Sequence, residues 1–221
     1  MPIVQGRAPA YDGCMKRLLL TAALLLAAAS YVASAQFDYY VLALSYAPDF
    51  CAAGNGYKDP LECGRGRKLD FVVHGLWPEF ERGRGPEHCG AARPVAARTV
   101  DAMLAYIPSR SLIQHEWKEH GVCADMGSDE FFTQVRRARD AVRIPRDLAG
   151  LRRQIELSPQ QIEEQFQAAN PGFPRGAFHA TCTGEALQEV RVCFTKNLMP
   201  RACSMSAGEC RSRSMIVRAV Q

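Results

Sequence analysis

The feature that most constrains the fold of this chain is an even set of cysteines. Eight of them follow residue 35: Cys51, Cys63, Cys89, Cys123, Cys182, Cys193, Cys203 and Cys210. In an exported chain, such a set predicts four disulfides formed in an oxidising compartment. Eight cysteines allow about a hundred different pairings, so the count alone does not choose between them. Because no two of them form a close Cys-x-x-Cys pair, a zinc ribbon is excluded.

The N-terminal segment gives the reason to expect export. From the initiator Met15, two basic residues precede an apolar run over 18–29, and small residues ending at Ala35 fit a cleavage site. This order is typical of a secretory signal peptide, and the apolar run is too short for a comfortable membrane span. We expect residues 1–35 to form a signal peptide, with an upstream extension before Met15, and residues 36–221 to form one mature domain.

The charge of this mature domain is weakly positive. The whole chain has a formal net charge of +4, and residues 1–35 carry three basic residues and one acidic residue, which leaves +2. That value is too small to indicate a nucleic-acid partner by itself. A partner has to be inferred from a site.

The pattern of apolar residues predicts strands at both ends of the mature domain and helices between them. Strands are expected at 37–46, 68–74, 187–194 and 214–220. Helices are expected at 95–106, 115–120, 131–142 and 158–170, with Ser128 as the N-cap of the third. Loops are expected at 51–67 and 82–86. This order predicts an α+β fold, a single disulfide-linked domain with a central, largely antiparallel sheet and several helices packed against it.

Two short segments hold three of the five histidines. Residues 71–80 contain His74, and residues 115–123 contain His115 and His120. An acid and a base that exchange protons near neutral pH are the minimum requirement for cutting an ester. Since a glycine and a proline follow His74, we expect it at the end of a strand, where sites are commonly built.

On a helix, Glu116 and His120 lie one turn apart on the same face. A carboxylate at that distance is expected to raise the pKa of the imidazole and to orient it. The alternative is a surface ion pair worth at most ~1 kcal/mol. A zinc protease is excluded because its motif needs histidines four apart, whereas His115 and His120 are five apart, about 140° round a helix. His88 lies in a loop beside a cysteine and His179 has no partner in sequence, so neither indicates a metal site.

Both segments resemble the active-site signatures of the ribonuclease T2 family of secreted acid ribonucleases. The first signature, Phe-Val-x-His-Gly-Leu-Trp-Pro, is matched by residues 71–78. The second, His-Glu-Trp-x-Lys-His-Gly-Thr-Cys, is matched at His115, Glu116, Trp117, His120, Gly121 and Cys123. Residues 37–45 also resemble the first strand of the family, and 161–193 its C-terminal half. The resemblance therefore covers most of the mature domain.

The resemblance implies an endoribonuclease that cuts single-stranded RNA with broad base preference and without a metal or other cofactor. His120 would take the proton of the ribose 2′-hydroxyl, and His74 would protonate the leaving 5′-oxygen, which gives a 2′,3′-cyclic phosphate and then a 3′-phosphate. Glu116 would help to hold charge and protons around the phosphorane, and His115 would bind phosphate as a cation.

The resemblance also assigns Trp77 and Glu79 to a base site, where an aromatic face stacks on a base and a carboxylate accepts from its amino group. Simple core packing is the alternative for Trp77. DNA lacks the 2′-hydroxyl and should not be cut. We also expect the mature protein to be secreted or periplasmic, to be a monomer, and to have no membrane contact after removal of the signal peptide.

One position departs from the family pattern. The family has a lysine three residues after the glutamate, but this chain has Glu119 there. Lys118 is the nearest candidate for a phosphate-binding lysine, although it points about 200° from Glu116 on a regular helix. Glu119 adds negative charge where phosphate charge builds, and it could hold His115, four residues earlier, protonated. We expect a working but altered enzyme in which some phosphate-binding charge comes from elsewhere.

Family precedent implies the disulfides Cys51–Cys63, Cys89–Cys123, Cys182–Cys210 and Cys193–Cys203. The second of these would hold His120 in register with His74. Two rival interpretations stay open. One is a catalytically attenuated RNA-binding or cytotoxic relative on the same fold, and the other is an unrelated disulfide-rich hydrolase, for which the sequence offers no nucleophile.

Overall fold

The computed structural model describes residues 1–2, 37–53, 59–204 and 210–220. The predicted signal peptide, residues 1–35, lies outside the described residues except for Met1 and Pro2, and it stays a prediction. Within the described ranges, no helix is long and apolar enough to cross a membrane.

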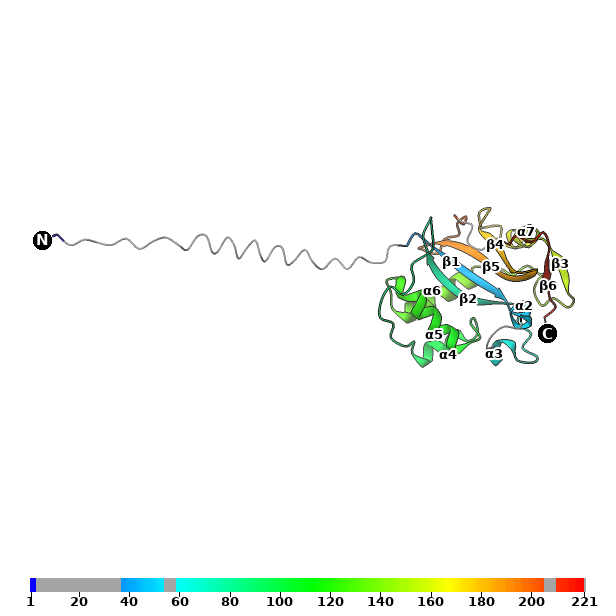
Figure 1. The fold of residues 1–221 in the computed structure, drawn as a ribbon, viewed down its shortest axis with the longest axis horizontal. Helices are drawn as coiled ribbons and strands as arrows, with labels where there is room; N and C mark the ends of the chain where they lie inside the picture. Colours follow the sequence, from blue (N-terminus) through cyan, green and yellow to red (C-terminus); the bar gives the residue numbers. More distant parts are fainter. Residues whose placement is uncertain (3–36, 54–58, 205–209, 221) are drawn as a thin grey trace. The chain divides into compact units, whose positions relative to one another are not determined.

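A six-stranded sheet forms the centre of the domain (Figure 1). The strands are β1 Tyr39–Tyr46, β2 Phe71–Glu79, β3 Ile155–Leu157, β4 Phe178–Thr183, β5 Ala186–Thr195 and β6 Met215–Val217. They lie in the order β2-β1-β5-β6-β3, and β4 pairs with β5 outside this path. Among the described strands, only β5 and β6 pair in parallel. The predicted α+β fold with a largely antiparallel sheet is confirmed.

The helices pack around this sheet in separate groups. They are α2 Ala47–Ala52, α3 Pro60–Cys63, α4 Ala97–Met103, α5 Arg110–Glu119, α6 Ser128–Asp140 and α7 Pro159–Ala169, with a 3-10 turn, η2, at Gly121–Cys123. Helices α4, α5 and α6 lie together beside β2, whereas α7 packs against β4 (Figure 1). The N-cap of α5 is Ser109, whose hydroxyl accepts the N–H of Leu112. Helix α7 is preceded by a capping box formed by Ser158 and Gln161.

Strand β1 is buried on both faces and divides the domain. On one face, Leu42 and Leu44 join the main core. On the other face, Tyr39 and Val41 form a small apolar cluster with Cys193, and Trp77 packs against it. This second face of the sheet continues into the polar site described below.

Four disulfides join described cysteines, and they are the four pairs that the family resemblance implies: Cys51–Cys63, Cys89–Cys123, Cys182–Cys210 and Cys193–Cys203. Cys89 lies in the loop after β2 and Cys123 lies in η2, directly after α5. This bond therefore links the two elements that carry the histidine signatures.

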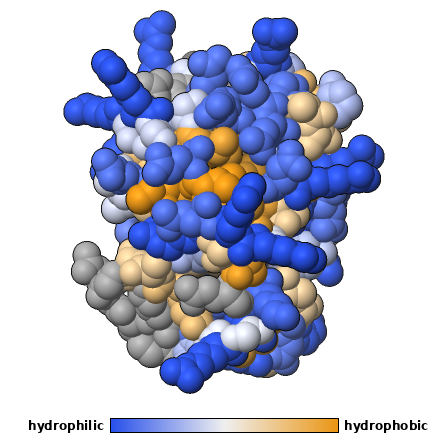
Figure 2. Space-filling model, turned by 90° about the vertical axis from the view of Figure 1, so that its right-hand side faces the viewer, coloured by the Kyte–Doolittle hydropathy of each residue, from blue (hydrophilic) through white to orange (hydrophobic). Residues whose placement is uncertain are grey.

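The surface at the β3–β6 end of the sheet is mostly hydrophilic, and an apolar patch near its middle is enclosed by polar and charged side chains (Figure 2). Among the described residues after Met1, the exposed large apolar side chains are Phe50, Leu61 and Met199. Single exposed apolar side chains of this kind are normal on protein surfaces.

Strand β2 is longer than predicted. The expectation that Gly75 and Pro78 end it is wrong, because the strand continues to Glu79 with Pro78 opposite Tyr40. Since β2 is at the edge of the sheet, a residue without an N–H is tolerated there.

Smaller corrections concern loops and short strands. The predicted loop 51–67 contains the end of α2 and the short helix α3. Gly127, and not Ser128, is the N-cap of α6. Two strands were not predicted from the sequence. Strand β3 is too short for a periodic signal, and the conformation of β4 depends on its backbone pairing with β5.

Candidate active site

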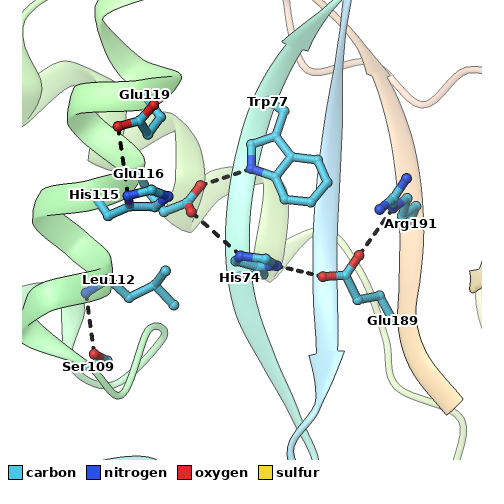
Figure 3. A network of polar contacts seen from close by, with 9 residues as sticks. All are labelled: His74, Trp77, Ser109, Leu112, His115, Glu116, Glu119, Glu189 and Arg191. Carbon is cyan, nitrogen blue, oxygen red and sulfur yellow. Dashed lines mark hydrogen bonds and ion pairs between the residues drawn. The ribbon is translucent and has the colours of Figure 1, made fainter. Parts of the chain in front are cut away.

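The two histidine segments meet where α5 packs against β2 (Figure 3). Nε2 of His74 lies 3.6 Å from Oε1 of Glu116, and the other oxygen of Glu116 accepts the indole N–H of Trp77 at 2.8 Å. The ring of Trp77 is close to both histidines, with centroid distances of 5.1 Å to His74 and 5.6 Å to His120. The fold therefore gathers the three residues that the sequence analysis assigns to catalysis.

A β-bulge places His74 and Trp77 on the same face of β2. In a regular strand, residues three apart point to opposite faces. Here Ala43 of β1 pairs with Gly75 and the next residue of β1 pairs with Val73, so His74 is the extra residue. Bulges of this kind re-aim side chains beside active sites. The expectation that His74 lies at the end of a strand is wrong, since it lies within β2.

Gly75 leaves the space that the carboxylate of Glu116 occupies. A Cβ atom on Gly75 would lie 2.0 Å from Oε2 of Glu116 and 2.4 Å from Nε1 of Trp77. Both distances are far shorter than a van der Waals contact. A glycine is therefore required at position 75 for steric reasons, because its missing side chain lets the buried carboxylate of Glu116 approach β2.

Strand β5 contributes two residues that the sequence analysis did not assign to the site, Glu189 and Arg191. Oε1 of Glu189 lies 2.5 Å from Nδ1 of His74, and Oε2 accepts from Nε of Arg191 at 3.1 Å (Figure 3). Strand β1 runs between β2 and β5, and its residues opposite Arg191 and Glu189 are Ala43 and Ser45. Because both are small, His74 and Glu189 can meet across β1.

Charge and burial set the protonation of this pair. Partial burial of the imidazole opposes its charge, but the hydrogen bond and the charge of Glu189 outweigh it, so the pKa of His74 is raised. Burial would raise the pKa of Glu189, but His74 and Arg191 outweigh that effect and lower it. Glu189 thus favours the protonated form of His74, with Nδ1 bound to Glu189 and Nε2 directed to Glu116.

Glu116 and His120 are shifted away from their usual charge states. Burial raises the pKa of Glu116 from 4.5 to about 7. Burial lowers the pKa of His120 from 6.5 to about 4. The expectation that Glu116 raises the pKa of His120 is wrong, because desolvation dominates at His120 while the charge of Glu116 acts on His74. The raised pKa favours the charged imidazole at His74 and the lowered pKa favours the neutral imidazole at His120, which is the division that acid–base chemistry needs.

A hollow of about 260 Å³ opens beside Trp77 and His120. Glu79, Arg191 and the loop segment 83–87 complete its lining. The guanidinium carbon of Arg191 lies 5.2 Å from the centre of the Trp77 ring, and burial raises the pKa of Glu79. An aromatic face with a carboxylate and a guanidinium beside it can hold a planar ring and hydrogen-bond to its edge. The two residues assigned to base binding thus share one pocket.

Comparison with known proteins identifies the family. The sequence pattern of the ribonuclease T2 family matches residues 37–203. The chain belongs to the ribonuclease T2 family. It is 34% identical over 165 residues to a ribonuclease of Aeromonas hydrophila, which covers 73% of each chain. It is 28% identical over 183 residues to a probable ribonuclease of Haemophilus influenzae, which covers 77% of this chain and 62% of that protein.

Solved structures show the same ribonuclease T2 fold. An RNase-related protein from Calystegia sepium superposes with a TM-score of 0.67 at 21% identity, over 84% of this chain and 99% of that one. Ribonuclease MC1 from the seeds of bitter gourd gives a TM-score of 0.63 at 20% identity, over 81% of this chain and 99% of that one.

Glu119 stands where the ribonuclease T2 signature has a lysine, and it is surrounded by basic side chains. One oxygen lies 2.5 Å from Nε2 of His88, and the other lies 3.8 Å from Nδ1 of His115 and 3.4 Å from Nζ of Lys118. His115 and Lys118, the two predicted phosphate-binding residues, are both mostly exposed and flank Glu119. Helical spacing suggests His115 as the partner of Glu119, whereas the shortest contact of Glu119 is with His88, in the loop after β2.

The fifth histidine belongs to another part of this ribonuclease T2 domain. His179 lies on β4, and its Nδ1 is 4.0 Å from Oε1 of Glu163 on α7. This contact has no connection with the site at β2 and α5.

Proposed function

We propose that the protein is a metal-independent endoribonuclease that cleaves single-stranded RNA through a 2′,3′-cyclic phosphate, with broad base preference. The observation that carries the proposal is the pair of histidines with opposite pKa shifts beside Trp77. A raised pKa suits His74 as the general acid, and a lowered pKa suits His120 as the general base.

In the first step, His120 takes the proton of the ribose 2′-hydroxyl while the 2′-oxygen attacks the adjacent phosphorus. The bond from phosphorus to the 5′-oxygen breaks, and His74 gives its Nε2 proton to that oxygen. In the second step the roles reverse: water attacks the phosphorus of the cyclic phosphate while His74 takes a proton from the water. The bond from phosphorus to the 2′-oxygen breaks, and His120 protonates that oxygen, which leaves a 3′-phosphate. Glu116, beside Nε2 of His74, helps to hold charge and protons around the phosphorane. His115 binds phosphate as a cation.

Two hollows support an RNA chain as the substrate. The hollow beside Trp77 and Glu79 would hold the base on the 5′ side of the cleaved bond. A second, largely apolar hollow of about 250 Å³ adjoins His74 and Glu189 and is lined by Leu112 among others. An endonuclease needs room on both sides of the phosphate that it attacks. Solved structures with this fold include a mutant of RNase MC1 in complex with 5′-UMP and RNase NT in complex with 5′-AMP.

The proposal includes the export and the assembly of the protein. Four disulfides favour a secreted or periplasmic location. We propose that the protein acts there as a monomer after removal of residues 1–35. N-terminal sequencing of the exported protein tests this, and a retained Lys16 would contradict it. DNA should be inert because it has no 2′-hydroxyl to attack.

The central experiment incubates the purified protein with RNA and EDTA and looks for 2′,3′-cyclic phosphate ends. We expect these ends from the wild type and none from His74→Ala or His120→Ala. Inhibition by EDTA would indicate a metal enzyme instead. Binding of RNA without cleavage would favour the alternative, a catalytically attenuated RNA-binding or cytotoxic relative.

A further inference from the structure

The loop between β2 and α4 is fastened to α5 and η2 by a row of contacts. The contacts are Val95 with Gln114, Arg93 with Trp117, His88 with Glu119, and Cys89 with Cys123. The loop therefore runs back along the helix that carries the second histidine signature. The contact at His88 is the last one before the segment that lines the pocket beside Trp77.

Glu119 holds His88 in two ways. Oε2 of Glu119 lies 2.5 Å from Nε2 of His88, and the backbone carbonyl of Glu119 accepts the N–H of His88 at 2.9 Å. His88 has a φ of 54°, in the left-handed region that few non-glycine residues adopt. The two contacts thus fix a turn of the chain that would otherwise be unfavourable at a histidine.

The segment just before this turn, residues 83–87, forms one wall of the pocket. Gly85 is so close that a Cβ on it would lie 2.1 Å from the carbonyl oxygen of Pro78. The charge of Glu87 acts on His120 from the same segment. The backbone conformation at His88 therefore sets the course of residues 83–87. That course determines the shape of the pocket and the distance of the Glu87 carboxylate from His120.

We propose that Glu119 and His88 form a clamp that positions residues 83–87 as the wall of the base pocket, so that Glu119 is a positioning residue for substrate binding. This rests on the proposed function of the site. The clamp gives position 119 a role in holding the loop, whereas the family has a phosphate-binding lysine at this position. A lysine at 119 has no carboxylate oxygen to accept from Nε2 of His88 and could not make the side-chain contact of the clamp.

The test uses dinucleoside monophosphates that differ in the 5′ base. Glu119→Gln and His88→Asn each remove the ion pair, and asparagine tolerates the left-handed backbone at position 88. We expect each variant to raise KM roughly tenfold with little change in kcat, as loss of a hydrogen bond to a charged group would. The double variant should be no worse than the worse single one, because both changes break the same contact. Glu164→Gln, on the exposed side of α7, is the matched control and should change nothing.

A second arm separates the clamp from a direct role in chemistry. Glu119→Lys restores the family residue, and the clamp predicts a raised KM and no gain in turnover. A rise in kcat/KM for Glu119→Lys, or a fall in kcat at unchanged KM for Glu119→Gln, would overturn the proposal. So would additive effects in the double variant.

A third arm needs no catalysis. Amide hydrogen exchange of residues 83–88 should become faster in Glu119→Gln and in His88→Asn, while exchange in the β1 strand stays as in the wild type. Unchanged exchange in the loop would refute the clamp. A wild type that cuts no RNA would refute the proposed function, and the exchange measurement would still decide whether the clamp exists.

Discussion

Nδ1 of His74 and Oε1 of Glu189 lie 2.5 Å apart although they belong to strands that are not neighbours in the sheet. The contact crosses β1 above the small residues Ala43 and Ser45. It fixes the rotation of the imidazole, with Nε2 on the side of Glu116, and raises the pKa of His74, which favours a proton on Nε2. The buried carboxylate of Glu189 is in turn balanced by Arg191.

Glu189→Gln should move the alkaline limb of the pH profile to lower pH. The amide can still accept the hydrogen bond of His74, but the negative charge is gone, so the pKa of His74 falls. As the general acid, His74 must be protonated, and activity is lost as the pH rises through its pKa. We expect the alkaline limb of kcat/KM to shift by about one pH unit or more. The same profile for Glu185→Gln, in the exposed turn before β5, serves as the control, and an unshifted limb in Glu189→Gln would show that Glu189 does not set this pKa.

Gly75→Ala should abolish activity. The added Cβ would lie 2.0 Å from Oε2 of Glu116, so the carboxylate has to leave its place between His74 and Trp77. We expect a loss of more than a hundredfold in kcat/KM and roughly 1–3 kcal/mol in the free energy of unfolding, as for overpacking elsewhere. Gly90→Ala is the control, since a Cβ there meets no atom of the described structure within 4 Å. Equal activity of both variants would contradict the steric role of Gly75.

Part of this site could be predicted from sequence, and part could not. The two signatures identify His74, Glu116 and His120 because each signature is a local pattern of residue types. The bulge at His74 depends on how β2 pairs with β1, and no local pattern shows it. Without the bulge, His74 and Trp77 would point to opposite faces.

The partners of the site residues were equally hidden. Glu189 lies in β5, a mostly apolar strand, and is buried. A buried carboxylate needs a cationic or hydrogen-bonding partner. The sequence does not say that His74 is this partner. For Glu119, spacing on a helix suggests His115, but the fold brings in His88 at a shorter distance. Burial likewise reverses the expected pKa shift of His120, because helical spacing contains no information about desolvation.

Glu116 and His120 should make opposite contributions to stability between about pH 4 and pH 7. The pKa of Glu116 is about 7 in the folded state and 4.5 in the unfolded chain. Its contribution to the free energy of unfolding therefore falls as the pH rises through this window. The pKa of His120 is about 4 in the folded state and 6.5 in the unfolded chain. Its contribution to the free energy of unfolding is therefore lost as the pH falls through this window. Urea unfolding should give a free energy that rises with pH in Glu116→Gln and falls with pH in His120→Asn, relative to the wild type. Parallel curves for all three proteins would contradict both shifts.

Removal of the Cys89–Cys123 disulfide should cost activity before it costs secondary structure. The bond spans 34 residues and links the loop after β2 to the end of α5, so it helps to keep His120 in register with His74. We expect the variant with both cysteines replaced by alanine to lose most of its turnover, and roughly 2–4 kcal/mol of stability, while its far-ultraviolet circular dichroism stays native at low temperature. The matched control replaces Cys51 and Cys63, whose bond spans 12 residues between α2 and α3. That variant should lose stability and keep its kcat, because its bond joins α2 to α3 and links neither β2 nor α5. If both variants lost the same turnover, the Cys89–Cys123 bond would have no special part in the geometry of the site.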